Sequence, residues 1–161
     1  SPPNQILIGL ALFLTFFIMW PTFTQINENA ITPLDNGEIT QEEALDRAVE
    51  PIRNFMYGQT EEKDLKLFCE ISDTTYEDYD DIPFVVLVPS FILSELRAAF
   101  IIGVVIYIPF IVIDMVVSSV LMSMGMMMLP PTTISLPFKI LLFVLADGWN
   151  LVIGGLVKTF Y

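Results

Sequence analysis

Long apolar runs flank one polar segment along this chain. Residues 5–20 are apolar except at Gln5 and Thr15, and two further apolar regions cover 84–129 and 134–157. A helix needs about 20 consecutive apolar residues to cross a hydrocarbon core of about 30 Å. The apolar residues come in continuous runs rather than at amphipathic spacing. The pattern therefore predicts an all-α protein built from membrane-type helical hairpins.

Proline and polar residues suggest where the first two apolar regions end or fold. We expect Pro21 to close the first helix, with residues 22–26 as a possible extension. The region 84–129 is too long for one span and suits two helices. The run Ser-Glu-Leu-Arg at 94–97 is expected to be a polar turn within it.

Three further prolines are expected to shape the C-terminal part of the chain. Proline lacks a backbone N–H and clashes with the preceding helical turn. We therefore expect Pro109 to kink the middle of the second apolar region, and Pro130 with Pro131 to end it. A single last helix is expected over 134–157, with two charged residues inside it.

The polar segment between the first two apolar regions is strongly acidic. The chain has a net charge of −12, and 16 of its 19 carboxylates lie within 28–81, together with four of its seven cations. This composition predicts a small water-facing helical subdomain between apolar regions. With so few cations and no basic stripe, the sequence argues against nucleic-acid binding.

A capping signal marks the first helix of this acidic subdomain. Thr40 followed by Glu43 forms a capping box, which predicts a helix start. Pro51 is expected to kink or interrupt the helix. The apolar positions expected on one face of this helix are Leu45, Ala48, Val49, Ile52 and Met56.

A second acidic helix and a loop are expected to follow. Thr60 is the predicted N-cap, with Leu65 and Phe68 as the buried stripe. Residues 72–81 are acidic and are interpreted as a loop; a calcium loop is the alternative, although the spacing and central Gly of an EF-hand are missing. Cys69 is the single cysteine and the chain has no His, so neither an intrachain disulfide nor a zinc site is expected, and no cofactor is predicted.

Charged residues inside apolar sequence are the first candidates for function. An ionised group at bilayer depth costs at least about 2.5–3.5 kcal/mol, so such groups usually form pairs or face a cavity. Lys139 is the only cation deep in the last apolar region, and Glu95 and Asp114 are its candidate partners. The simplest interpretation is an ion pair that packs helices or subunits together. The alternatives are a proton or ion relay, or exposure at an interface.

A methionine-rich segment is the second candidate. Five of the eight methionines, Met122, Met124, Met126, Met127 and Met128, fall within seven residues around Gly125 and before Pro130 and Pro131. Irregular backbone at membrane depth is tolerated only where it is buried in protein or lines a cavity. Because Met is flexible and polarizable, a ring of such loops would make a compliant apolar seal. The simpler reading is ordinary apolar filling at a helix end.

The same segments carry a family resemblance that extends over essentially the whole chain. The matching runs are Pro-Pro-Asn-Gln at 2–5, Pro-Ser-Phe-Ile-Leu-Ser-Glu-Leu-Arg-Ala-Ala-Phe at 89–100, Ile-Pro-Phe at 108–110, Ile-Asp at 113–114, Gly-Met-Met-Met at 125–128, Leu-Pro-Phe-Lys at 136–139 and Asp-Gly-Trp at 147–149. In these runs the chain resembles the FliP family of flagellar type III secretion export-gate proteins and the related injectisome proteins. Members of that family normally begin further upstream, so the chain resembles their C-terminal two-thirds.

The resemblance implies a subunit of a multi-copy export gate that is not an enzyme. Its implied partners are further copies of itself, two smaller export-gate membrane proteins, membrane lipid, and unfolded exported proteins as substrates. Met126, Met127 and Met128 match the family's gasket, and Glu95 and Lys139 match positions that pair between neighbouring subunits.

The resemblance also implies a location and a division of the chain. It places the protein in the bacterial inner membrane at the flagellar basal body. The expected regions are an N-terminal hydrophobic helix at 1–26, an acidic extracytoplasmic helical subdomain at 27–83, and a hydrophobic hairpin region with the Met-rich loop at 84–161.

Two other classes of protein remain as alternatives to a passive gate. A proton-coupled secondary transporter would use Asp114 or Glu95 as its proton carrier, but its usual internal repeat is not evident in the sequence. A membrane enzyme would need a nucleophile and base or a set of metal ligands, and neither pattern is visible.

Overall fold

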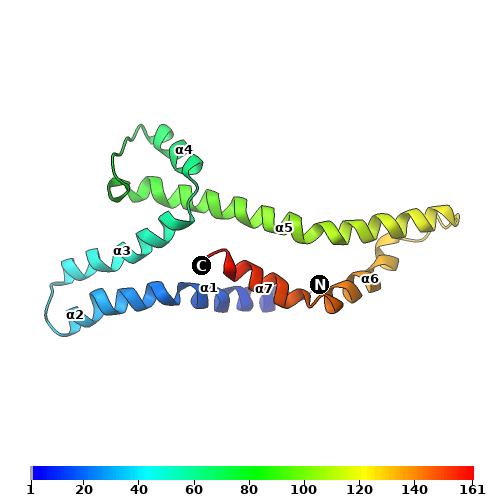
Figure 1. The fold of residues 1–161 in the computed structure, drawn as a ribbon, viewed down its shortest axis with the longest axis horizontal. Helices are drawn as coiled ribbons and strands as arrows, with labels where there is room; N and C mark the ends of the chain where they lie inside the picture. Colours follow the sequence, from blue (N-terminus) through cyan, green and yellow to red (C-terminus); the bar gives the residue numbers. More distant parts are fainter. Residues whose placement is uncertain (1) are drawn as a thin grey trace. The chain divides into compact units, whose positions relative to one another are not determined.

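The structure, a computed structural model, describes residues 2–161, and within this range the chain is helical with no β-strand (Figure 1). This confirms the all-α prediction. By length and composition, Asn4–Asp35 and Phe84–Ser123 are long and apolar enough to cross a membrane. A third span would be added if the bent pair Pro131–Leu145 and Gly148–Lys158 counts as one. The chain forms two compact units that divide after Leu96.

The first unit begins with a long helix that continues beyond its proline. Helix α1 covers Asn4–Ile26 and passes without a break through a π-helical turn, η1 at Asn27–Ile31, into α2 at Thr32–Asp35. Pro21 therefore does not close the helix, and the expected extension over residues 22–26 is confirmed, since α1 ends at Ile26. The turns after Pro21 pack against α3 and bury Thr22 and Ala30, and this packing offsets the one backbone hydrogen bond that proline removes.

Helix α3, Gln41–Gln59, folds back along α1 (Figure 1). The predicted N-cap is confirmed, because the Thr40 hydroxyl accepts a hydrogen bond from the Glu43 N–H at 3.3 Å. The predicted interruption at Pro51 was wrong. Pro51 is buried inside the helix, and it lines a small pocket together with Gln25 of α1 and Asn29 of η1, so its ring packs toward that hairpin partner.

Helix α4, Glu62–Ser72, carries the predicted stripe but not the predicted cap. Leu65 is buried and Phe68 packs on the same cluster, as expected. The Thr60 hydroxyl instead donates to the Met56 carbonyl at 2.7 Å and so closes the end of α3, while Glu61 becomes the N-cap residue of α4. A loop and a short 3-10 turn, Tyr79–Asp81, follow as predicted, and the described residues hold no group of three acids placed to bind a metal.

The core of the first unit gathers α3, α4 and the start of α5. Its buried members are Met56, Leu65, Ile82, Val86 and Leu87. Polar contacts close its edges. The Ser94 hydroxyl donates to the buried Asp64 carboxylate at 2.7 Å and accepts the Glu61 N–H at 2.9 Å.

Helix α5 is one helix from Phe84 to Ser123, where the sequence suggested two. The polar run 94–97 lies inside it rather than in a turn, because the buried Ser94 bonds to α4 and the neighbouring residues are good helix formers. Pro109 also lies within the helix, which does not end there. Pro130 and Pro131 do not end it either, since they form the N-cap and first residue of α6, Pro131–Leu145.

The last apolar region is two helices rather than the single helix predicted for 134–157. Helices α6 and α7 (Gly148–Lys158) meet at a bend of 61°, where Asp147 has a positive φ of 50°. A Cβ on Gly148 would overlap the Phe143 ring, which also packs edge-on against Trp149 with centroids 5.3 Å apart. Glycine is therefore required at this bend.

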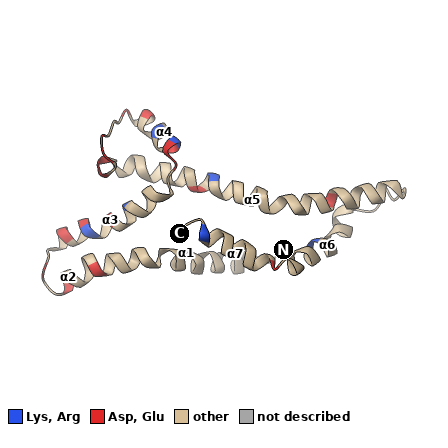
Figure 2. Cartoon of the chain, viewed as in Figure 1, with Lys and Arg blue, Asp and Glu red and all other residues tan. Residues whose placement is uncertain are grey.

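The two units are defined by contacts within the chain. The regions predicted at 1–26, 27–83 and 84–161 are instead defined by whether each region is expected to face membrane or water. The three-part division therefore stays a prediction. Charged residues lie mainly on α2, α3, α4 and the turn before α5, and they are sparse on the other helices (Figure 2).

The crowding at the bend gives a testable prediction. We expect Gly148→Ala to destabilise the protein by about 1–3 kcal/mol, the usual cost of forcing an extra methyl into a packed site. Gly155→Ala in the same helix is the control, since open space surrounds its Cβ position. Thermal unfolding in detergent would measure both variants, and equal midpoints would contradict the predicted role of Gly148.

Candidate functional site

The methionine segment begins with a well-defined helix end. The N–H of Met126 donates to the Leu121 carbonyl at 3.0 Å, and the N–H of Gly125 donates to the Met122 carbonyl at 3.1 Å. This pair of bonds is a Schellman motif, which needs a left-handed residue, and Gly125 has φ +72°. The chain therefore leaves α5 at a fixed point, and residues 124–130 form the connection to α6.

The methionine side chains along this connection are exposed. Met127 is 83% and Met128 is 98% accessible, and Met122, Met124 and Met126 are also exposed. Burying one such side chain is worth about 1.5–3 kcal/mol. The segment thus presents a flexible apolar surface that can gain contacts by packing against another surface.

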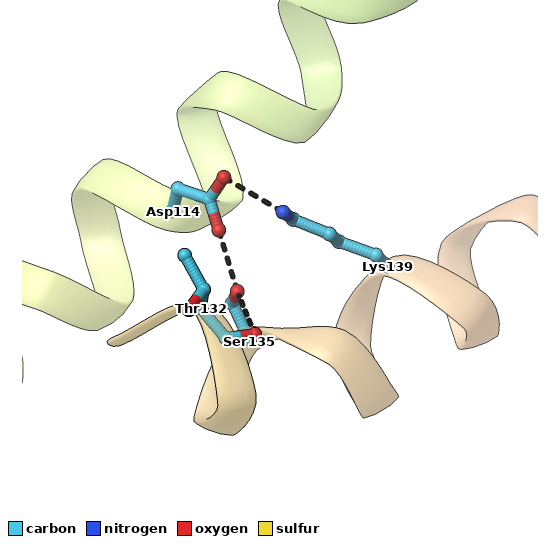
Figure 3. Close-up of polar contacts among 4 residues, drawn as sticks. All are labelled: Asp114, Thr132, Ser135 and Lys139. Atoms are coloured by element: carbon cyan, nitrogen blue, oxygen red, sulfur yellow. Dashed lines mark hydrogen bonds and ion pairs between the residues drawn. The ribbon is translucent and has the colours of Figure 1, made fainter. Parts of the chain in front are cut away.

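A small polar cluster joins the helices on either side of this segment (Figure 3). The Lys139 ammonium of α6 lies 2.7 Å from Asp114 Oδ2 of α5. The Ser135 hydroxyl donates to the other oxygen of the same carboxylate, and its Oγ also lies 3.1 Å from the Thr132 carbonyl oxygen. Ser135 is fully buried, while the Asp114 and Lys139 side chains are about one-quarter exposed.

This cluster fixes the spacing of α5 and α6 next to the methionine segment. Both carboxylate oxygens of Asp114 are engaged, one by a cation and one by a hydroxyl. Charge-assisted hydrogen bonds of this kind are about twice as strong as neutral ones. An apolar groove of about 430 Å³ lies between the same helices and is lined from α5 by Val112, Val116 and Val120 and from α6 by Ile134 and Phe138.

The structure thus gives Lys139 a partner within its own chain. The sequence left Glu95 and Asp114 as candidates, and the family resemblance favoured Glu95 of a neighbouring copy. Glu95 is half-buried in α5 and forms no ion pair among the described residues. The ion pair between Glu95 and Lys139 of different subunits stays a prediction. For that pair to form, Glu95 would have to bind Lys139 beside Asp114 or take the place of Asp114 as its partner.

Sequence reasoning missed Ser135. The residue precedes Lys139 by four positions, so the two side chains lie on the same face of a helix. A serine four residues before the only cation of an apolar helix was the sequence signal that could have identified Ser135 as a member of the cluster.

Comparison with known proteins matches the chain to one family over nearly its whole length. A profile described as the FliP family matches residues 1–156. The flagellar biosynthetic protein FliP of Bacillus subtilis strain 168 is 59% identical over 160 residues, which cover 99% of this chain and 72% of that protein. Proteins of the same name from Pectobacterium carotovorum and Borreliella burgdorferi are 50% and 49% identical, with 100% and 99% of this chain covered.

The chain is shorter than these relatives. It spans 63% of the Pectobacterium protein and 65% of the Borreliella protein, and only 45% of a relative from Buchnera aphidicola. These shares agree with the resemblance to a C-terminal portion of the family.

The polar cluster predicts energetic coupling between α5 and α6. We expect Asp114→Asn and Lys139→Gln each to destabilise the protein, because each leaves the other charge without its partner. The double variant should lose less than the two single losses combined, by about 0.5–3 kcal/mol. The coupling is obtained from the free energies of unfolding, in detergent, of the unchanged protein, the two single variants and the double variant. Ser119→Ala, at an exposed α5 serine, is the control, and additive single losses would contradict the predicted coupling.

Proposed function

The chain belongs to the FliP family, and we propose that it is a core channel subunit of the flagellar type III protein export gate. In this proposal it forms part of a protein-conducting pore, and the methionine segment seals that pore. It acts as a passive structural subunit and carries out no catalysis.

The observation that carries this proposal is the exposure of Met127 and Met128 on a connection held at both ends. The Schellman motif at Gly125 fixes where α5 ends, and the Asp114–Lys139 pair ties α6 to α5. The backbone ends of the segment are therefore well defined while its side chains are free to repack. A seal that must open for a passing chain and close again needs this combination, since Met adapts to many shapes.

The wider apolar surface supports assembly with other components. The most apolar stretch of each candidate span buries almost none of its residues within the chain. We propose that further copies of the chain, two smaller export-gate membrane proteins and membrane lipid cover them, and that unfolded exported proteins are the substrates. The acidic segment 27–83 would lie on the extracytoplasmic side of the bacterial inner membrane.

The polar cluster favours the gate over a proton-coupled transporter. A carrier carboxylate has to exchange its proton with water and alternate between partners. Asp114 instead has both oxygens engaged by Lys139 and Ser135. Asp114 is therefore better suited to hold two helices together than to carry protons.

The proposed seal predicts a leak when its side chains are shortened. In the assembled, full-length gate, replacing Met126, Met127 and Met128 together with Ala should raise ion conductance across reconstituted membranes several-fold, because three flexible side chains no longer fill the constriction. The matched control is Val104→Ala, Val105→Ala and Met115→Ala, which shortens three exposed apolar side chains of α5. Unchanged conductance in the methionine variant, or an equal leak in the control, would argue against the seal.

The two candidate partners of Lys139 can be separated by charge reversal. If Glu95 of a neighbouring subunit pairs with Lys139, then Glu95→Lys and Lys139→Glu should each impair assembly of the gate, and their combination should partly restore it. If Asp114 is the essential partner, only Asp114→Lys combined with Lys139→Glu should restore assembly. Native gels of the purified complex would measure the assembled fraction, and rescue by the second combination alone would disprove the pair between subunits.

A further inference from the structure

Two of the five residues in the apolar stripe predicted along α3 are left exposed by the chain itself. Met56 lies in the core, but Leu45 is 66% and Ile52 is 38% exposed, and Val49 between them is half-buried. The helix instead turns Ala44 and Pro51 inward. The first turns of α3 therefore carry apolar side chains that have no apolar partner large enough to cover them.

Leu45 and Val49 border a groove that also carries charge. The groove has a volume of about 510 Å³ and its lining includes Leu45 and Val49 of α3 and Phe84 at the start of α5. Three carboxylates, those of Asp46, Glu50 and Asp80, lie on its rim, and Arg53 lies at one side. We call this surface the α3 groove.

The rim keeps most of its negative charge. Asp46, Glu50 and Asp80 form no ion pair among the described residues. Arg53 donates to the Ile82 carbonyl and lies 4.3 Å from the centre of the Phe84 ring. An apolar floor with an unpaired acidic rim suits a partner that brings both apolar and cationic side chains.

A second copy of this segment does not fit that description. Its other three cations are already paired within their own helices or turns, Arg47 with Glu43, Lys63 with Glu61 and Lys66 with Glu62. Two acidic segments facing each other would repel. An anionic membrane surface is disfavoured for the same reason.

From this uncovered stripe and its acidic rim, we propose that the α3 groove binds a cationic amphipathic helix of a different protein. Leu45, Val49 and Arg53 are spaced by four residues along α3, so the groove follows the helix for about two turns. Helices that bind in such grooves place apolar anchors at i, i+3, i+4 and i+7. The anchors would cover Leu45 and Val49, and flanking Lys or Arg would meet the three carboxylates.

The proposal is tested with the full chain in nanodiscs of zwitterionic lipid. The probe is a synthetic helical peptide with Leu along one face and Lys beside it. Two comparison peptides carry Glu in place of Lys, or the same residues in scrambled order. We expect the first peptide to bind, the other two to bind much more weakly, and added salt to weaken the binding.

Paired variants of the chain locate the binding surface. Leu45→Gln with Glu50→Gln should weaken binding by about tenfold or more, equivalent to about 1.4 kcal/mol or more. Leu67→Gln with Glu70→Gln makes the same changes at exposed positions of α4 and should leave binding unchanged. Equal losses in both variants, or equal binding of the scrambled peptide, would overturn the proposal in favour of general attraction to an acidic surface.

A labelling measurement tests the second copy as occupant. Leu45→Cys would be labelled with a maleimide in a Cys69→Ser background, which removes the native thiol. That thiol is half-buried, and burial raises its pKa, so the Cys69→Ser change removes only a slow competing reaction. We expect the peptide to protect Cys at position 45, at every protein concentration. Protection that grows with protein concentration in the absence of peptide would overturn the proposal and assign the groove to self-association.

Discussion

Every backbone N–H and C=O in apolar surroundings must find its partner within the protein, and this constraint decides where the helices run and where they stop. Helices α1, α3 and α5 continue through Pro21, Pro51 and Pro109, since each proline removes one donor while the turns around it keep theirs. Where the chain leaves a helix, at Asp73 and at Gly125, a left-handed residue closes the last carbonyls with the same pair of hydrogen bonds. The helix ends are therefore defined rather than frayed, and this gives the methionine segment its fixed starting point.

The same helices leave most of their apolar side chains uncovered. The most apolar stretch of each candidate span buries almost nothing within the chain. The compact core of Met56, Leu65, Ile82, Val86 and Leu87 is formed by α3, α4 and the start of α5. Such a chain gains most of its burial by meeting lipid or other proteins. Its exposed surfaces differ in kind. The spans are mainly apolar, the methionine segment carries flexible apolar side chains, and the α3 groove combines an apolar floor with acidic side chains.

Polar side chains link neighbouring elements at a few points. Ser94 of α5 bonds Asp64 of α4, and Lys139 and Ser135 of α6 bond Asp114 of α5. Among the described residues no buried side-chain nitrogen or oxygen lacks a hydrogen-bond partner. Because an unpaired polar group in apolar surroundings is costly, these contacts specify which helix faces meet, whereas the interchangeable apolar contacts around them do not.

Local sequence patterns were sufficient to predict the fold class of the protein and much of the helical structure in its acidic segment. Continuous apolar runs predicted membrane-type helices, the Thr40–Glu43 spacing predicted the start of α3, and Leu65 was recognised as buried. The family resemblance, carried by motifs along the whole chain, was confirmed by the comparisons. These features depend on residues that are neighbours in sequence, so the sequence by itself determined them.

Contacts between distant residues decided the rest. Asp114 meets Ser135 and Lys139 across 21 and 25 positions, and no periodicity could choose between it and Glu95. The polar run at 94–97 stays helical because Ser94 reaches Asp64, and the last helix breaks at Asp147 because Phe143 and Trp149 pack across Gly148. The sequence therefore determined which segments are helical and apolar. Only the tertiary structure decided where those helices break and which charges pair, because both depend on atoms that folding brings together.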